Sequence, residues 1–273
     1  MLRQVAAALS LSAERQLSSR VVGGVGHRVV FREMGNAMHV NLQLLQGDRL
    51  DCSLRRFFVD EFYMHHAAQL KPGSRVLDLG GQKAPKRGRF DIERYDVRVR
   101  YANLSAAHRP DVQTDASALP FKEESFDAVI CAEMVEHVAD PMRVMHEVHR
   151  VLRRRGILLM TVPFLFPIHE DPYDYCRYTD HYWRENLERI GFEDMAIEAQ
   201  GLFWSVVVDM TRAWFNEQVR RGRPRSVLLQ RLITRLVTKG KRLAVARERR
   251  IDAVDHAFIK RYTTGYGIRV VRS

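Results

Sequence analysis

The stretch Arg75-Val76-Leu77-Asp78-Leu79-Gly80-Gly81 decides how this chain is expected to fold. Its apolar residues are typical of a short buried strand, and the strand ends on an acidic residue and a pair of glycines. In a parallel sheet such a strand end lies beside a ligand, because glycine lets the backbone turn sharply and approach closely. The sequence therefore predicts a binding loop at residues 78–81.

Further strands and helices alternate along the chain. A second buried strand is expected at residues 126–132, and helices are expected at residues 54–70, 140–152 and 179–190. The remaining strands are expected around residues 97–104, 111–115, 157–162, 192–198 and 265–271. This alternation predicts an α/β fold with a doubly wound, mostly parallel seven-stranded sheet.

Local signals support two of these boundaries. Asp140-Pro141 marks a helix start, because aspartate accepts hydrogen bonds from free backbone N–H groups and proline is favoured at the first helical position. Gly156 is expected to turn the chain from that helix into the strand at 157–162.

The positive charge of the chain is concentrated in one segment. The 273 residues include 44 Lys and Arg against 33 Asp and Glu, for a formal net charge of +11. Residues 220–250 hold twelve of the basic residues and one acid, Glu248, so the rest of the chain is balanced in charge. The sheet region therefore carries no electrostatic signature of nucleic-acid binding, and no nucleic-acid partner is expected.

Cysteine usage and hydropathy indicate the cellular compartment in which the protein is expected. Cys52, Cys131 and Cys176 are far apart and lack metal-ligand spacing, which favours reduced thiols and predicts no metal site. No apolar run reaches the ~18–20 residues of a membrane span. Residues 1–13 are too short a core for a signal peptide. We therefore expect a cytoplasmic protein.

Four regions are expected along the sequence. Residues 1–50 are interpreted as a helical N-terminal extension and residues 51–200 as the core. Residues 201–262 are interpreted as a basic helical insertion, and residues 263–273 as the closing strand of the core sheet.

The basic segment at residues 220–250 leaves two interpretations open. Its leucines recur at helical spacing, and Arg231, Arg235 and Lys239 lie four residues apart on another face. A basic amphipathic helix suits the surface of an anionic membrane, so peripheral membrane contact is one hypothesis. The alternative is a helical cap packed on the core, with its basic face in solvent.

In their order, these segments resemble the class I S-adenosylmethionine-dependent methyltransferases over roughly residues 70 to 200. The resemblance implies S-adenosylmethionine as cofactor, with the Asp78 carboxylate near the cofactor's amino group and Asn103 at the position that holds the ribose. Asp115 would accept from the adenine amino group, although an aspartate there also suits a turn cap. The implied cofactor-binding residues are Asp78, Gly80, Gly81, Asn103, Asp115, Ala116, Cys131 and Glu133.

The sequence departs from the family pattern at Asn103, where the family commonly has Asp or Glu, and in two further places. Gln82 and Ala84 stand where the family has its second and third loop glycines, and Arg154-Arg155-Gly156 stands where it prefers Pro-Gly-Gly. These departures support an alternative function, a catalytically silent methyltransferase-fold protein that acts as a binding or scaffold subunit.

The segment Val162-Pro163-Phe164 to Thr179 resembles the "VPF…H…P.D..RYT" passage of a methyltransferase type 11-like subgroup often associated with glycan and secondary-metabolite modification. Loops at the carboxyl ends of strands carry the substrate site in this architecture, which predicts an acceptor pocket containing Asp174, Arg177 and Tyr178. The alternative is that Asp174 and Arg177 form a structural ion pair that shapes the loop.

A histidine in this pocket would serve as the base for a hydroxyl acceptor, because imidazole titrates near neutral pH. His169 is the first candidate and His137, in the Glu133-Met134-Val135-Glu136-His137 passage, is the second. A histidine at a helix start is also a common structural hydrogen-bonder, so that role for His137 stays open. The sequence thus predicts O-methylation of a small molecule or a glycan.

Overall fold

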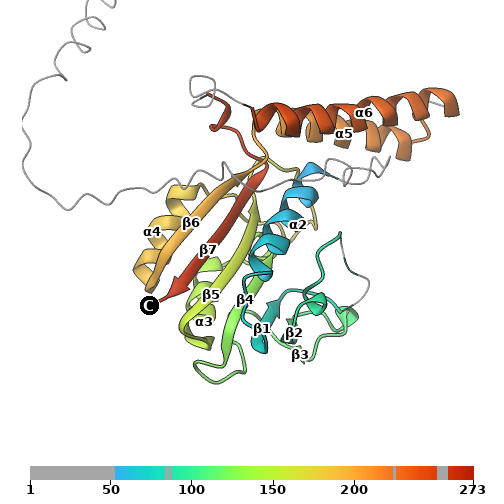
Figure 1. The fold of residues 1–273 in the computed structure, drawn as a ribbon. Coiled ribbons are helices and arrows are strands. Elements are labelled where there is room, and N and C mark those ends of the chain that lie inside the picture. Colours follow the sequence, from blue (N-terminus) through green and yellow to red (C-terminus); the bar gives the residue numbers. More distant parts are fainter. Residues whose placement is uncertain (1–52, 84–85, 87, 224–225, 251–257) are drawn as a thin grey trace, which may run out of the picture. The chain divides into compact units, whose positions relative to one another are not determined.

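The computed structural model contains a seven-stranded sheet in the order β3-β2-β1-β4-β5-β7-β6 (Figure 1). The strands are β1 (Ser74–Leu79), β2 (Val97–Asn103), β3 (Val112–Gln113), β4 (Phe126–Ala132), β5 (Leu152–Pro163), β6 (Phe192–Gln200) and β7 (Gly265–Arg272). The structure describes residues 53–83, 86, 88–223, 226–250 and 258–273, which belong to one compact unit. The expected extension at residues 1–50 lies outside the described residues.

The sheet is mostly parallel, as the sequence predicts. β1 pairs in parallel with β2 and β4, and β4 pairs in parallel with β5. β7 is antiparallel to both of its neighbours, β5 and β6. All strands except β7 therefore end at the same edge of the sheet, where a ligand is expected in this architecture.

The start of β5 differs from the sequence prediction. The chain passes from helix into strand at Leu152 rather than turning at Gly156, and β5 begins opposite Phe126 of β4. An irregular register then follows, because Ile157 pairs with Ala128. The Arg153 guanidinium donates to the Asp127 carboxylate at 2.7 Å, which fixes the irregular segment onto β4.

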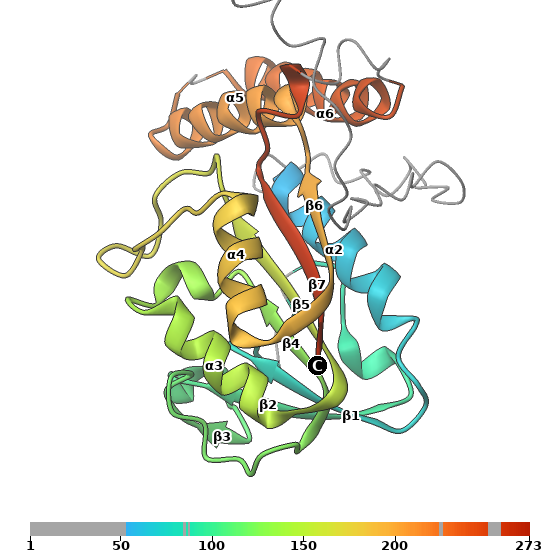
Figure 2. The same ribbon diagram turned by 90° about the vertical axis from the view of Figure 1, so that its left-hand side faces the viewer.

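Helices cover both faces of the sheet (Figures 1 and 2). α2 (Leu54–Ala67) lies on one face, and α3 (Pro141–Val151) and α4 (Asp180–Ile190) lie on the other. Asp140 caps α3 by accepting from the Arg143 N–H at 3.1 Å, which confirms the predicted helix start. Short 3₁₀ helices are η2 (Ile92–Arg94), η3 (Ala106–His108) and η4 (Val135–His137).

Between β6 and β7 the chain forms a helical hairpin, α5 (Phe203–Arg220) and α6 (Val227–Glu248). The two helices lie side by side beyond the edge where β6 ends (Figures 1 and 2). The Asp209 carboxylate of α5 accepts from the Leu54 and Arg55 N–H groups at 2.8 and 2.9 Å, so the hairpin caps the start of α2. None of the described helices is long and apolar enough to cross a bilayer.

Candidate functional site

The loop after β1 turns tightly around the side chain of Asp78. Gly80 has a φ of 81°, which a residue with a side chain adopts only under strain. A Cβ on Gly81 would collide with the Asp78 carboxylate, so the glycine lets the loop backbone pack directly on that acid. The Gly80 N–H donates to the Ala102 carbonyl of β2 at 2.8 Å and ties the turn to the sheet.

Asp78 is the most strongly perturbed acid of this loop. It is 9% exposed, and burial raises its pKa to about 7. Lys86 lowers that pKa, whereas Asp91 and Glu93 raise it. The carboxyl group therefore changes charge near neutral pH, where a cationic ligand would favour the ionised form.

Asn103, at the end of β2, uses its side chain within the protein. Its Nδ2 donates to the carbonyls of Gly80 and Gly81 at 2.8 and 3.0 Å. Its Oδ1 accepts from the Ser105 N–H at 2.9 Å. In this arrangement Asn103 holds the glycine turn in place, a function that the sequence alone did not suggest.

The loop after β3 places Asp115 and Ala116 at the same edge. Asp115 is exposed, and one of its carboxylate oxygens accepts from the Ser117 N–H at 2.8 Å. This hydrogen bond holds the pKa of Asp115 below its ordinary value. The turn cap that the sequence allowed is thus present, and the carboxylate is exposed at the same edge.

Two further predicted cofactor residues stand at the end of β4. Cys131 is fully buried, and burial raises the pKa of its thiol well above its ordinary value. Glu133 has a φ of 49° and forms a two-point ion pair with the Arg55 guanidinium, with contacts of 3.0 and 2.5 Å. Burial raises the pKa of Glu133, but Arg55 outweighs that effect and the pKa lies below its ordinary value.

Glu136 and His137 follow in η4. Glu136 is 1% exposed, and neither of its carboxylate oxygens has a hydrogen-bond partner among the described residues. Burial raises the pKa of Glu136 well above its ordinary value, and the nearby Glu133 carboxylate raises it further. His137 Nδ1 lies 2.7 Å from the Tyr173 carbonyl oxygen, and its Nε2 lies 3.6 Å from Glu136 Oε1.

The loop after β5 brings His169 to the same place. The His169 and His137 rings meet edge to face, with centroids 4.8 Å apart. His169 is half-buried, and its Nδ1 lies 3.2 Å from the Pro167 carbonyl oxygen. The two histidines that the sequence named as base candidates are therefore neighbours, and Glu136, a buried acid to which the sequence assigned no role, lies beside His137.

The predicted acceptor residues shape this loop. Arg177 binds Asp174 through two contacts of 2.5 and 2.7 Å, and this pairing lowers the pKa of Asp174 to about 2. Asp174 also accepts from the His169 N–H at 2.9 Å. Tyr178 stacks on Tyr182, with ring centroids 3.8 Å apart. The ion pair thus has the structural role that the sequence left open, and it positions His169.

The sequence assigned no role to Arg55 or Glu136, which the structure places at this edge of the sheet. Arg55 is 2% exposed and joins α2 to Glu133 and, at 2.7 Å, to Gln200. No local pattern marks a contact between residues so far apart in the chain. A sequence signal for Glu136 did exist. It is an acid next to a histidine directly after a buried strand, and charged residues are rarely buried.

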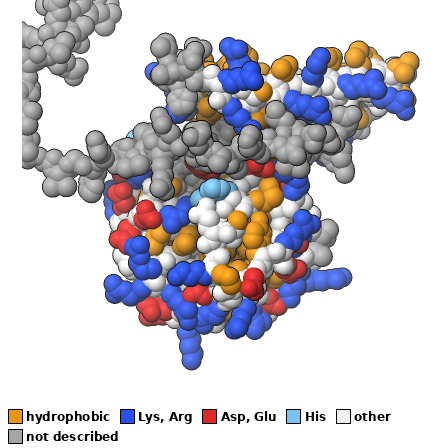
Figure 3. Space-filling model, in the orientation of Figure 1, with side chains coloured by type: hydrophobic (Ala, Val, Ile, Leu, Met, Phe, Trp, Pro, Cys, Tyr) orange, Lys and Arg blue, Asp and Glu red, His pale blue; other side chains and the backbone are white. Residues whose placement is uncertain are grey.

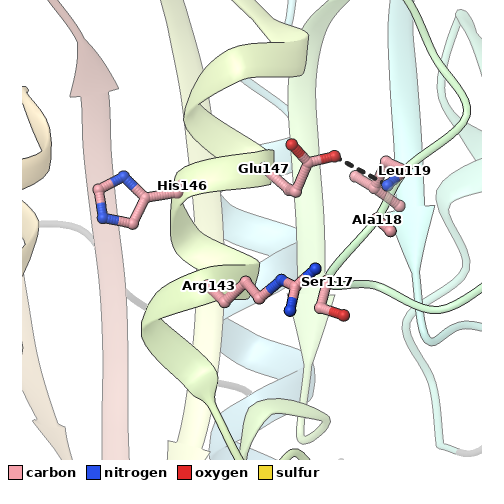
Figure 4. Close-up of a pocket in the computed structure, with 6 residues that line it drawn as sticks. All are labelled: Ser117, Ala118, Leu119, Arg143, His146 and Glu147. Atoms are coloured by element: carbon pink, nitrogen blue, oxygen red, sulfur yellow. Dashed lines mark hydrogen bonds between the residues drawn. The ribbon is translucent and has the colours of Figure 1, made fainter.

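A separate hollow of about 450 Å³ lies next to the Asp115–Ala116 loop. Arg143 and Glu147 of α3 face the segment Ser117–Leu119 across it, and Glu147 accepts from the Leu119 N–H at 2.8 Å (Figure 4). His146 also lines it, but Asp78, His137 and His169 do not, so it is a neighbour of the candidate site and not the site itself.

Comparison with known proteins identifies one domain model. Residues 88–160 match a model described as a methyltransferase domain. A glycine/sarcosine/dimethylglycine N-methyltransferase of Actinopolyspora halophila is 29% identical over 191 residues, which cover 60% of this chain and 33% of that protein. A ubiquinone/menaquinone biosynthesis C-methyltransferase of Xanthomonas oryzae is 33% identical over 119 residues, which cover 37% and 45%. The chain spans less than half the length of both relatives.

A solved structure shares the fold. It is described as a sarcosine dimethylglycine methyltransferase from Galdieria sulphuraria, and it aligns with a TM-score of 0.50 at 15% identity. The alignment covers 80% of this chain and 85% of that one. At this identity the likeness speaks for the arrangement of strands and helices alone.

Proposed function

Because the chain belongs to the class I S-adenosylmethionine-dependent methyltransferases, we propose that it transfers a methyl group from S-adenosylmethionine to a hydroxyl of a small molecule or glycan. The observation that carries the proposal is the group of proton-accepting side chains, His137 and His169, at the edge where β4 and β5 end. An oxygen acceptor has to lose its proton during methyl transfer, and an imidazole suits that task.

The residues present fit the cofactor. It carries an ammonium group, and the buried Asp78 carboxylate beneath the glycine turn is an anion that such a group would stabilise. The exposed carboxylate of Asp115 and the backbone of Ala116 are the proposed adenine contacts. The proposed role of Glu133 is to line the site with its orientation fixed by Arg55, while Asn103 supports the turn instead of reaching the ribose.

The cofactor supplies a methyl group that is already activated as part of a sulfonium ion. The protein then has to hold the acceptor in line with that methyl group and exclude water, and proximity of this kind can supply ~7–11 kcal/mol. The loop at residues 164–179 is proposed to hold the acceptor, with Tyr178 as an aromatic surface and the Asp174–Arg177 pair as its support.

The relatives favour a small-molecule acceptor. Their names place methyl groups on nitrogen and on carbon, so the acceptor atom is the finer part of this proposal. Oxygen is favoured here because the histidines lie beside Glu136 at the proposed transfer position, and a base is required when a hydroxyl is the acceptor.

A calorimetric titration with S-adenosylmethionine and with its demethylated product tests the proposal. We expect 1:1 binding of both compounds. If neither binds at millimolar concentration, the alternative of a catalytically silent scaffold protein replaces the proposal.

We also propose that the hairpin of α5 and α6 contacts an anionic membrane surface from one side. Leu228, Leu232 and Leu236 of α6 are 77%, 52% and 59% exposed, and Trp214 of α5 is 59% exposed. Basic residues flank this row at Arg231 and Arg235. Figure 3 shows apolar side chains along the outer edge of the hairpin with Lys and Arg beside them. Exposed leucines in that number suit an interfacial helix better than a cap in water.

A further inference from the structure

Three side chains with metal-ligating atoms meet at the end of β4. Glu136 and His137 come from η4, and His169 comes from the loop after β5. One carboxylate oxygen and one ring nitrogen of each histidine all lie within 4.8 Å of one another. The sequence predicted no metal site, because the residues are separated by 32 positions and the spacing matches no motif.

The Glu136 carboxylate needs a partner. It is 1% exposed, and neither oxygen has a hydrogen-bond partner among the described residues. Burying an unpaired carboxylate costs several kcal/mol or more. Buried polar groups without partners are rare in folded proteins and mark places where an ion or ligand is bound.

Both imidazoles are held through Nδ1. His137 Nδ1 lies 2.7 Å from the Tyr173 carbonyl oxygen, and His169 Nδ1 lies 3.2 Å from the Pro167 carbonyl oxygen. A carbonyl oxygen only accepts, so each Nδ1 carries the hydrogen and each Nε2 keeps its lone pair. The Asp174 carboxylate lies 3.3 Å from His169 Nδ1, and Arg177 fixes that acid in turn. Metal-binding histidines typically have such a hydrogen-bonded partner on the second nitrogen.

We propose that Glu136, His137 and His169 bind one divalent transition-metal ion through a carboxylate oxygen and two Nε2 atoms. Two imidazoles and one carboxylate suit Zn²⁺, Co²⁺ or Fe²⁺, whereas Mg²⁺ prefers oxygen ligands. Ligand atoms at bond lengths of 2.0–2.2 Å lie about 3–3.5 Å apart. Glu136 and His137 are already 3.6 Å apart, so closure requires a small movement of the His169 loop.

The role of the ion in catalysis rests on the proposed function. Three protein ligands leave a coordination position open, as catalytic metal sites do. The acceptor hydroxyl would occupy that position, where the cation would stabilise the oxyanion, and its proton would pass to solvent water before the oxygen attacks the methyl group. The histidines would then act as ligands instead of as a base, because the ion would lower the pKa of the bound hydroxyl far enough for water to take its proton.

The test is metal binding by the full chain after treatment with a chelator. Calorimetric titration with Zn²⁺, and the visible spectrum on titration with Co²⁺, should both show one site per chain, with much weaker binding of Mg²⁺. Glu136→Gln and His169→Ala should each lower Zn²⁺ affinity by at least ~100-fold. The matched controls are His181→Ala and Glu185→Gln, which change exposed residues of α4 and should bind Zn²⁺ as the parent chain does.

A second readout does not depend on metal. In the metal-free chain Glu136→Gln should keep or raise the thermal midpoint, because a neutral amide replaces a buried carboxyl group that has no hydrogen-bond partner among the described residues. The proposal is overturned if one-site binding is absent, if both site variants bind like the controls, or if Glu136→Gln lowers the midpoint. Binding of S-adenosylmethionine by the metal-free chain is measured in parallel, so the failure of this proposal and of methyl transfer can be told apart.

Discussion

The two halves of the edge where the parallel strands end differ in how fully their polar side chains are hydrogen-bonded within the protein. In the half formed by β1, β2 and β3, Asn103 and Asp115 bind backbone groups of their own loops. In the half formed by β4 and β5, the buried Glu136 carboxyl group and the buried Nε of Arg177 have no hydrogen-bond partner among the described residues. The polar groups of the first half are largely hydrogen-bonded within the protein, and we call this half the cradle. These two polar groups of the second half need a bound ion or ligand for their hydrogen bonds.

The largest effect of a substitution is expected in the half formed by β4 and β5. His169→Ala should lower turnover by ~10²–10⁴-fold while the affinity for S-adenosylmethionine changes little. The reason is that His169 lies with the acceptor cluster and away from the β1 loop that is assigned to the cofactor. Steady-state rates and a cofactor titration on the same preparation measure both quantities, with His181→Ala as the control.

Near-normal turnover of His169→Ala would make that ring structural and transfer the role to His137. An equal loss of turnover and cofactor affinity would mean that the two halves are not separable, and the comparison between them would fail.

At the cradle the effects should be smaller and confined to binding. Asp115→Ala removes an acceptor for the adenine amino group, which costs ~1–3 kcal/mol or about 5- to 150-fold in affinity. Asp115→Asn is the matched control, because the amide oxygen can still accept from Ser117 and keep the turn. Calorimetry should rank the parent chain first, Asp115→Asn second and Asp115→Ala last; equal affinities would remove Asp115 from the site.

The buried acid of the cradle predicts a pH dependence of cofactor binding. Burial raises the pKa of Asp78 to about 7, so below that pH the carboxyl is protonated in the free protein and must lose its proton to bind an ammonium group. Affinity should therefore fall by up to about tenfold per pH unit below 7 and level off above it. Titrations at several pH values give the profile.

Asp78→Asn is the control for that profile. It should bind more weakly at pH 8 and lose the slope between pH 6 and 7, because the amide does not titrate there. A slope that persists in Asp78→Asn would assign the pH dependence to the cofactor or to another residue.

The smallest effect is expected far from both halves, at the hairpin. Sedimentation with anionic vesicles should recover the protein at low salt, less at physiological salt, and little with neutral vesicles. Arg235→Gln should weaken binding to anionic vesicles by about 1 kcal/mol, or roughly fivefold in the partition constant, because it removes one positive charge near the membrane surface. Arg189→Gln, which changes an exposed arginine of α4, is the control. Equal, negligible recovery with both lipids would leave the hairpin as a solvated cap.

The sequence predicted those parts of the fold that depend on local patterns. The strand at Phe126–Ala132 was predicted to its ends because only Asp127 interrupts its apolar residues, and α3 was predicted from the Asp140-Pro141 pair. The predicted start of β5 was wrong by several residues. The contact between Arg153 and Asp127 holds the arginines before Gly156 in the strand. That contact joins segments 26 residues apart, which a local pattern does not reveal.

The candidate site divides in the same way. His137 and His169 could be proposed from their motifs, and the structure places their rings in contact. Three other features could not be predicted, because each depends on which groups meet after folding. They are the ion pair of Arg55 with Glu133, the hydrogen bonds of Asn103 to the glycine turn, and the lack of a hydrogen-bond partner for Glu136 among the described residues.

Methyl transfer itself is the central claim, and isotope labelling tests it most directly. The full chain is incubated with S-adenosylmethionine that carries a deuterated methyl group, together with fractions of small molecules and of glycans, and the products are examined by mass spectrometry. The account predicts a product that has gained one labelled methyl group on oxygen, formed by the parent chain and His181→Ala but not by His169→Ala. Label that stays entirely in the cofactor, although calorimetry shows the cofactor bound, would contradict the account and favour a binding protein with a methyltransferase fold.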